Sequence, residues 1–65
     1  MTDGTLRENI SVGNEVDIVL KKDQRSGTLT RGIVKRLLGK SPKHTHGIKV
    51  ELEDGQIGRV KEVLN

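Results

Sequence analysis

His44 and His46 are the residues of this chain whose type and spacing first suggest chemistry. They stand one residue apart in "SPKHTHGIKV", which covers residues 41–50. In an extended chain such residues point to one face, roughly 7 Å apart, so the two imidazoles could chelate a metal. Zinc needs about four ligands, or three with a water, and the remaining candidates are carboxylates without motif spacing, such as Asp23 and Asp54. We therefore predict no metal site and no cofactor, and we interpret the histidines as polar loop residues.

Groups that could support catalysis are few. Ser41 and His44 could form a nucleophile–base pair, but nothing in the sequence orients the base. No glycine-rich loop leads into a helix, and Glu51 and Glu53 are expected on an outward strand face. A barrel of 65 residues also leaves no room for a pocket of roughly several hundred Å3. We predict that the protein is not an enzyme.

Positive charge is concentrated in the middle of the chain. Residues 21–49 contain nine Lys or Arg and one acid, a balance of +8, whereas the remaining residues contain three Lys or Arg and eight acids, a balance of −5. Cations spaced along a strand and its two flanking loops can follow a phosphate backbone without reading bases. The predicted nucleic-acid contacts are Lys21, Lys22, Arg25, Arg31, Lys35, Arg36, Lys40 and Lys43, with His44 and His46 as auxiliary residues.

The chain contains no Phe, Tyr or Trp, which bears on the kind of partner. Without these rings there is no aromatic platform for single-stranded bases, so we expect contact with structured RNA, such as ribosomal RNA, through phosphates. Three alternatives stay open. Cross-strand ion pairs could absorb the charge, the lysines could serve solubility alone, or the barrel could bind a protein through the acidic residues 51–54. One contiguous basic face would favour nucleic acid, and interleaved signs with an exposed apolar patch would favour protein.

Length and composition limit the class of protein. A chain of 65 residues forms one small domain, and the absence of cysteine excludes disulfides and thiolate metal sites. The first residues lack the apolar core of a signal peptide, and no apolar run approaches the length of a membrane span. We predict a cytoplasmic monomer that does not enter membranes.

Alternating apolar residues predict strands over roughly 15–22 and 28–38, with a bend or bulge at Gly32 in the second. A short helix over 33–38 is the alternative for part of that stretch. The pattern after Gly47 predicts a hairpin, in which Asp54 and Gly55 form a two-residue type I′ turn with positive φ at Gly55. That turn would pair residue 52 with residue 57, and a bulge at Gly58 would return Val60 to the core.

These elements predict an all-β fold, a small SH3-like barrel of four to five antiparallel strands with glycine bends and bulges. Residues 9–65 would form the barrel, and residues 1–8 a disordered tail. The predicted core residues are Val16, Ile18, Leu20, Leu29, Ile33, Ile48, Val50, Leu52, Ile57 and Val60, with Val19 on the outer face.

Two long stretches carry a family resemblance. "GNEVDIVLKKDQRSGTLTRGIVK" and "SPKHTHGIKVELEDGQIGRV" closely resemble the YwbE family of small prokaryotic proteins over nearly the whole chain. The resemblance implies little about activity, because that family is one of unknown function. A looser similarity to the KOW motif of translation and transcription proteins depends on glycines and β-branched residues between Gly13 and Val34. It implies association with RNA or the ribosome.

Overall fold

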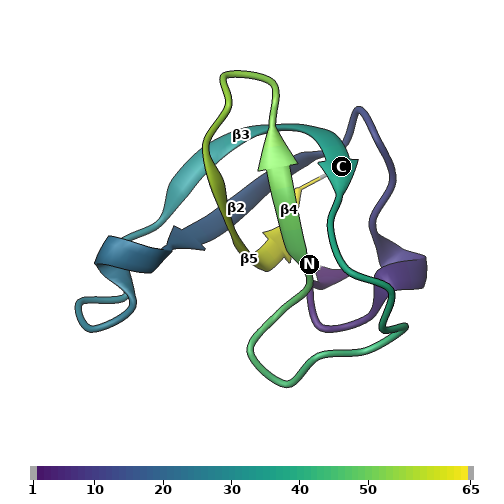
Figure 1. Ribbon diagram of the computed structural model, residues 1–65, viewed down its shortest axis with the longest axis horizontal. Coiled ribbons are helices and arrows are strands. Elements are labelled where there is room, and N and C mark those ends of the chain that lie inside the picture. Colours follow the sequence, from purple (N-terminus) through teal and green to yellow (C-terminus); the bar gives the residue numbers. More distant parts are fainter. Residues whose placement is uncertain (1, 65) are drawn as a thin grey trace.

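The computed structural model describes residues 2–64, with side chains from Gly4 onward. Within these residues the structure has five β-strands and two short 3-10 turns, joined by loops (Figure 1). In chain order they are β1 (Thr2–Asp3), η1 (Arg7–Asn9), β2 (Glu15–Leu20), η2 (Lys21–Asp23), β3 (Thr30–Leu37), β4 (Lys49–Leu52) and β5 (Ile57–Val63). The short-helix alternative for residues 33–38 is wrong, because β3 covers residues 33–37.

All strand pairs are antiparallel, and four of the strands close on themselves. The sheet order is β1-β5-β2-β3-β4, and a further pairing of β4 with β5 closes the barrel. Closure gives the backbone groups of the four strands a partner on both sides, which a small open sheet cannot do. The predicted fold class, an all-β small SH3-like barrel of four to five antiparallel strands, is confirmed.

The hairpin between β4 and β5 differs from the predicted turn. Gly55 has a φ of 91°, as predicted, but no non-glycine residue in the described chain has positive φ, so Asp54 does not form a type I′ turn. The Leu52 carbonyl accepts a hydrogen bond from the Gly55 N–H at 2.9 Å, and the Leu52 N–H donates to the Gln56 carbonyl at 2.8 Å. These bonds define a three-residue loop in which Gly55 is the left-handed bulge residue.

The extra turn residue shifts the register of β5 by one. Lys49 faces Arg59, and Val50 faces Gly58. Arg59 therefore lies on the outer face, whereas a two-residue turn with strict alternation would have pointed it inward. Val60 lies in the core without the bulge that we predicted at Gly58.

Two β-bulges bend the barrel strands, and both fall on lysines. In β5 the extra residue is Lys61, where the register with β2 shifts. In β3 the extra residue is Lys35, where the register with β4 shifts. The bulge predicted at Gly32 is wrong, because this glycine pairs with Val16 in the regular ladder. A Cβ at Gly32 would lie 2.6 Å from Leu52 Cδ1, so glycine is needed there for close packing.

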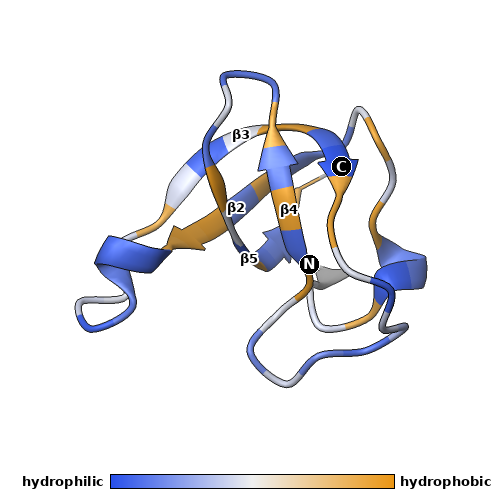
Figure 2. Cartoon of the chain, in the orientation of Figure 1, coloured by the Kyte–Doolittle hydropathy of each residue, from blue (hydrophilic) through white to orange (hydrophobic). Residues whose placement is uncertain are grey.

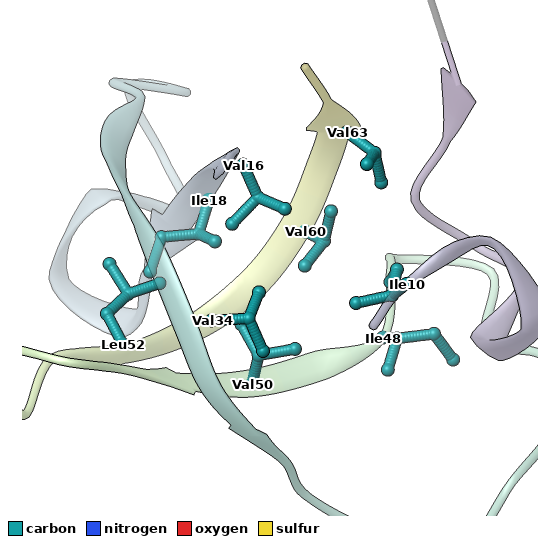
Figure 3. Packing of buried hydrophobic residues seen from close by; sticks show 9 residues of the cluster. All are labelled: Ile10, Val16, Ile18, Val34, Ile48, Val50, Leu52, Val60 and Val63. Atoms are coloured by element: carbon teal, nitrogen blue, oxygen red, sulfur yellow. The ribbon is translucent and has the colours of Figure 1, made fainter. Parts of the chain in front are cut away.

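Nine buried aliphatic side chains converge inside the barrel (Figure 3). Six of the predicted core residues belong to this cluster: Val16, Ile18, Ile48, Val50, Leu52 and Val60. Leu20 is partly buried and packs against it. The core predictions for Leu29 and Ile57 are wrong, since they are 49% and 44% exposed, and Ile33 is only half-buried. Three residues of the core cluster were not predicted from the alternation of apolar residues. Ile10 comes from the N-terminal segment, and Val34 and Val63 lie near the two bulges.

The N-terminal segment lies against the barrel, in contrast to the disordered tail predicted for residues 1–8. β1 pairs with β5, and Met1 is outside the described residues. The His44 N–H donates to the Thr5 carbonyl at 2.9 Å, and the Arg7 N–H donates to the Pro42 carbonyl at 2.8 Å. These backbone bonds tie the long loop after β3 to the N-terminal segment and so position the histidines.

Candidate nucleic-acid interface

Two of the predicted nucleic-acid contacts are occupied by cross-strand ion pairs. Arg31 Nε and Nη2 lie 3.1 and 3.4 Å from the two carboxylate oxygens of Asp17, a buried residue of β2. This pairing raises the pKa of the Arg31 guanidinium above its ordinary value. Arg36 Nε lies 2.6 Å from Glu51 Oε1. The ion-pair alternative therefore holds for the part of the barrel formed by β2, β3 and β4.

The other predicted cations are exposed, but they do not share one surface. Lys35 stands alone at the bulge of β3 and lines none of the pockets described below. The rest are on the two polar loops, at residues 21–29 and 38–48, which Figure 2 shows mostly in the colour of hydrophilic residues. Among them, Lys21 and Lys40 line pockets that also include Arg59. None of the three pockets is lined by Lys22, Arg25 or Lys43.

A like-charged pair crosses the outer face of β4 and β5. Lys49 and Arg59 are direct partners in the antiparallel ladder. Like charges in this position destabilise a sheet unless something of opposite sign lies between them. Among the described residues, neither side chain makes an ion pair with a carboxylate. Arg59 Nη1 instead donates to the Gly47 carbonyl at 3.4 Å, which holds the guanidinium beside the long loop.

A pocket with a volume of about 400 Å3 opens next to Arg59, between the two polar loops. We expected no pocket of this size. It was missed because it lies outside the barrel, where the loops rise above the sheet. Its lining includes Val19, Gln24, His44, His46, Arg59 and Lys61. Val19 does lie on the outer face of β2, as predicted, yet it is only 4% exposed and does not belong to the core cluster.

The two histidines are held differently. The His46 backbone N–H donates to His44 Nδ1 at 3.1 Å. An accepting Nδ1 carries no proton, so in this arrangement Nε2 is the nitrogen of the His44 ring that bears the N–H. The His46 side chain is exposed, and the ring centroids are 5.8 Å apart with planes tilted by 48°.

Three adjoining pockets have Arg59 in common. The second includes Lys40, His44 and Lys49, and the third includes Lys21 and Lys49. Within the described chain, no Asp or Glu lines any of the three. We call this surface the basic face, formed by Lys21, Lys40, His44, His46, Lys49, Arg59 and Lys61.

The residue pattern indicated only part of the basic face. Lys21, Lys40, His44 and His46 were predicted contacts, whereas Lys49, Arg59 and Lys61 were not. Arg59 was missed because the predicted contacts were taken from the basic segment of residues 21–49, and Arg59 lies outside that segment. A count of the turn as three residues, with Gly55 as its bulge, would have placed Arg59 opposite Lys49.

The metal prediction can be tested directly. In the part of the chain that the structure describes, no third His, Cys, Asp or Glu joins His44 and His46 in a group that could hold a metal. Two imidazoles alone form an incomplete zinc shell. We expect calorimetric titration with Zn2+ to give no site tighter than about 1 μM. A stoichiometric, tighter site that is lost in both His44→Ala and His46→Ala would contradict the prediction.

The fold and the surface together define a class: a small closed antiparallel β-barrel with one basic face. The chain belongs to the family described as "Uncharacterized conserved protein (DUF2196)", whose model matches residues 3–63. It is 58% identical over 62 residues to the "Uncharacterized protein YwbE" of Bacillus subtilis (strain 168), covering 95% of each chain. The resemblance to the YwbE family is thereby confirmed, and the KOW similarity stays a prediction. No solved structure matches the chain.

None of the helical turns within residues 2–64 has the length and apolar character needed to cross a membrane.

Proposed function

We propose that the protein is a non-catalytic binding module that contacts the phosphates of structured RNA through its basic face. The observation that carries this proposal is the Lys49–Arg59 pair, two cations in direct cross-strand register with no carboxylate partner in the described chain. A phosphate between them would replace their repulsion by two charge-assisted contacts. RNA or the ribosome is the proposed partner, and the proposed setting is a cytoplasmic monomer.

The arrangement supports backbone contact rather than reading of a base sequence. The cations of the basic face come from three places: η2 (Lys21), the loop after β3 (Lys40) and the strands β4 and β5 (Lys49, Arg59 and Lys61). Cations distributed over strands and loops can follow the spacing of phosphates, whereas reading bases in a groove requires an inserted helix or ribbon. Structured RNA offers that phosphate array with a wide, shallow minor groove.

A protein-interaction barrel is the second candidate, and two observations favour it. Ile57, on the outer face of β5, is 44% exposed and lines one of the three pockets of the basic face, together with Lys49 and Arg59. The ion pairs of Arg31 and Arg36 also give β3 interleaved charges. A partner protein would need an apolar surface to cover Ile57 and acidic residues around that surface.

Salt dependence tests the RNA proposal. If three to five phosphates are neutralised, log K should fall with log[salt] at a slope of about −3 to −5. Arg59→Gln should make the slope less negative by about one unit. It should also weaken binding by about eightfold at 0.1 M salt, for all RNA sequences alike. Lys35→Gln removes the same charge away from the basic face and should have little effect. The measurement is fluorescence anisotropy of a labelled RNA hairpin.

Heparin is the control for nonspecific binding of polyanions. Equal affinity for heparin and for structured RNA would reduce the proposal to a generally basic surface. Equal losses in Arg59→Gln and Lys35→Gln would contradict the assignment to the basic face. No RNA binding at about 50 mM salt would favour the protein-interaction candidate.

A further inference from the structure

The pocket between the two polar loops has features that contact with a duplex backbone does not use. Its volume of about 400 Å3 falls in the range of small-molecule and cofactor sites, roughly 300–1,000 Å3. A phosphate group alone would occupy a small part of that space. The pocket is therefore large enough for a whole nucleotide.

Two cations of the pocket lining are suited to a phosphate. Arg59 and Lys61 project from β5, and the Arg59 guanidinium is oriented by its bond to the Gly47 carbonyl. An oriented guanidinium recognises phosphate oxygens through paired N–H donors. Lys61, the bulge residue of β5, lines the pocket together with Arg59, and Val60 between them points into the core.

The lining also carries the two imidazole rings, which are the only aromatic side chains in the sequence. Histidine belongs to the residues on which unstacked RNA bases are placed. The His44 ring is held by its Nδ1 bond, so its face is already oriented before a ligand arrives. Our expectation of no stacking platform considered only Phe, Tyr and Trp and overlooked this ring pair.

The lining also contains groups suited to the middle of a nucleotide. Val19 is a nearly buried apolar side chain of β2, and Gln24 supplies an amide that can donate to and accept from ribose hydroxyls. The lining thus combines cations, imidazole rings and an amide, which are the groups that bind phosphate, base and ribose.

We propose that this pocket binds one unpaired nucleotide of a structured RNA, with its phosphate on Arg59 and Lys61 and its base against the rings of His44 and His46. The inference rests on the proposed function and deepens it, because it names the part of the RNA that is selected. A base paired within a helix is stacked on both sides and does not reach the pocket. The protein should therefore prefer an RNA with an overhanging or bulged nucleotide to a blunt duplex.

The experiment compares three RNA duplexes that differ at one end: blunt, with a one-nucleotide overhang, and with the same overhang lacking its base. The abasic duplex has the same added phosphate and so is the matched control for charge. The duplex with the intact overhang should bind at least about fivefold more tightly than the abasic one, which is the contribution expected from one stacked base. Anisotropy at one fixed salt concentration gives the three affinities.

Two variants assign the preference to the pocket. His46→Gln removes one ring but keeps the backbone N–H that holds His44, so the fold should persist, as circular dichroism would verify. It should reduce the ratio of the affinities for the intact and the abasic overhang, and this ratio, which does not depend on the affinity for the blunt duplex, is the readout. Arg59→Gln should weaken the binding of all three duplexes.

The outcomes separate the two proposals. Equal affinity for the three duplexes would overturn the nucleotide pocket and leave the phosphate-binding function standing. A preference that is the same for the intact and abasic overhangs would also overturn it, since the extra phosphate alone would explain the gain. No binding of any duplex would overturn the proposed function itself.

Discussion

Replacing Val50 by aspartate is expected to unfold the barrel. Val50 is 0% exposed and lies at the centre of β4, paired with Leu37 of β3 on one side and Gly58 of β5 on the other. A carboxylate there would be buried without a cationic partner, at a cost of several kcal/mol, on the order of the whole stability of a domain this small, roughly 3–10 kcal/mol. Far-UV circular dichroism and urea denaturation measure the result.

Leu29→Asp is the matched control for this prediction. The apolar pattern of the sequence also assigned Leu29 to the core, but the side chain is 49% exposed in the loop that precedes β3. The same substitution should therefore change the free energy of unfolding by only about 0.5 kcal/mol. A soluble Val50→Asp protein with an unchanged strand signal would contradict the core, and so would an unfolded Leu29→Asp protein.

Gly47→Ala should be the most damaging of the glycine substitutions at positive φ. Gly47 is buried immediately before β4, with a φ of 101°. A Cβ at this position would overlap the carbonyl oxygen of Val60, and the Val60 N–H donates to the Ile48 carbonyl at 2.9 Å. The added methyl group must push β4 and β5 apart as well as adopt a left-handed backbone. We expect a loss of about 3 kcal/mol or more, as the sum of both costs.

Gly55→Ala separates the two costs. Gly55 has a similar φ of 91°, but a Cβ there would meet no atom within 4 Å. Only the backbone cost remains, and the free energy of unfolding should fall by about 1–2 kcal/mol. Urea midpoints of the two variants provide the comparison. Equal losses would mean that the close approach of Gly47 to Val60 has no energetic consequence.

Gly47 also links stability to the proposed binding surface. Its carbonyl accepts the bond from Arg59 Nη1, and its neighbour His46 holds the ring of His44. The backbone contact that requires glycine therefore lies beside the guanidinium and the imidazoles. Binding measurements on Gly47 variants would mix loss of fold with loss of the site, so the substitutions at Arg59 and His46 are the better tests of function.

Local patterns in the sequence determined the strand content and much of the core. Val16 and Ile18 alternate with polar residues in β2, as Val50 and Leu52 do in β4, and each pair was assigned to the core from this period of two. Gly55 was placed at positive φ because Asp-Gly between apolar runs is typical of a hairpin. These features depend on residues close together in the chain, so the sequence alone was sufficient to predict them.

Tertiary structure decided the face on which each charge lies. A three-residue turn at Gly55 placed Arg59 outward beside Lys49, while ion pairs with Asp17 and Glu51 occupied two of the predicted phosphate contacts. The bulge at Lys61 let both Val60 and Val63 reach the core although they are three residues apart, while Lys61 itself lined the pocket. The physical reason is the strict alternation of a strand, in which one added residue moves every following side chain to the other face. The alternation in a sequence shows which residues of a strand share a face. Only the pairing of the strands decides which of the two faces points into the core.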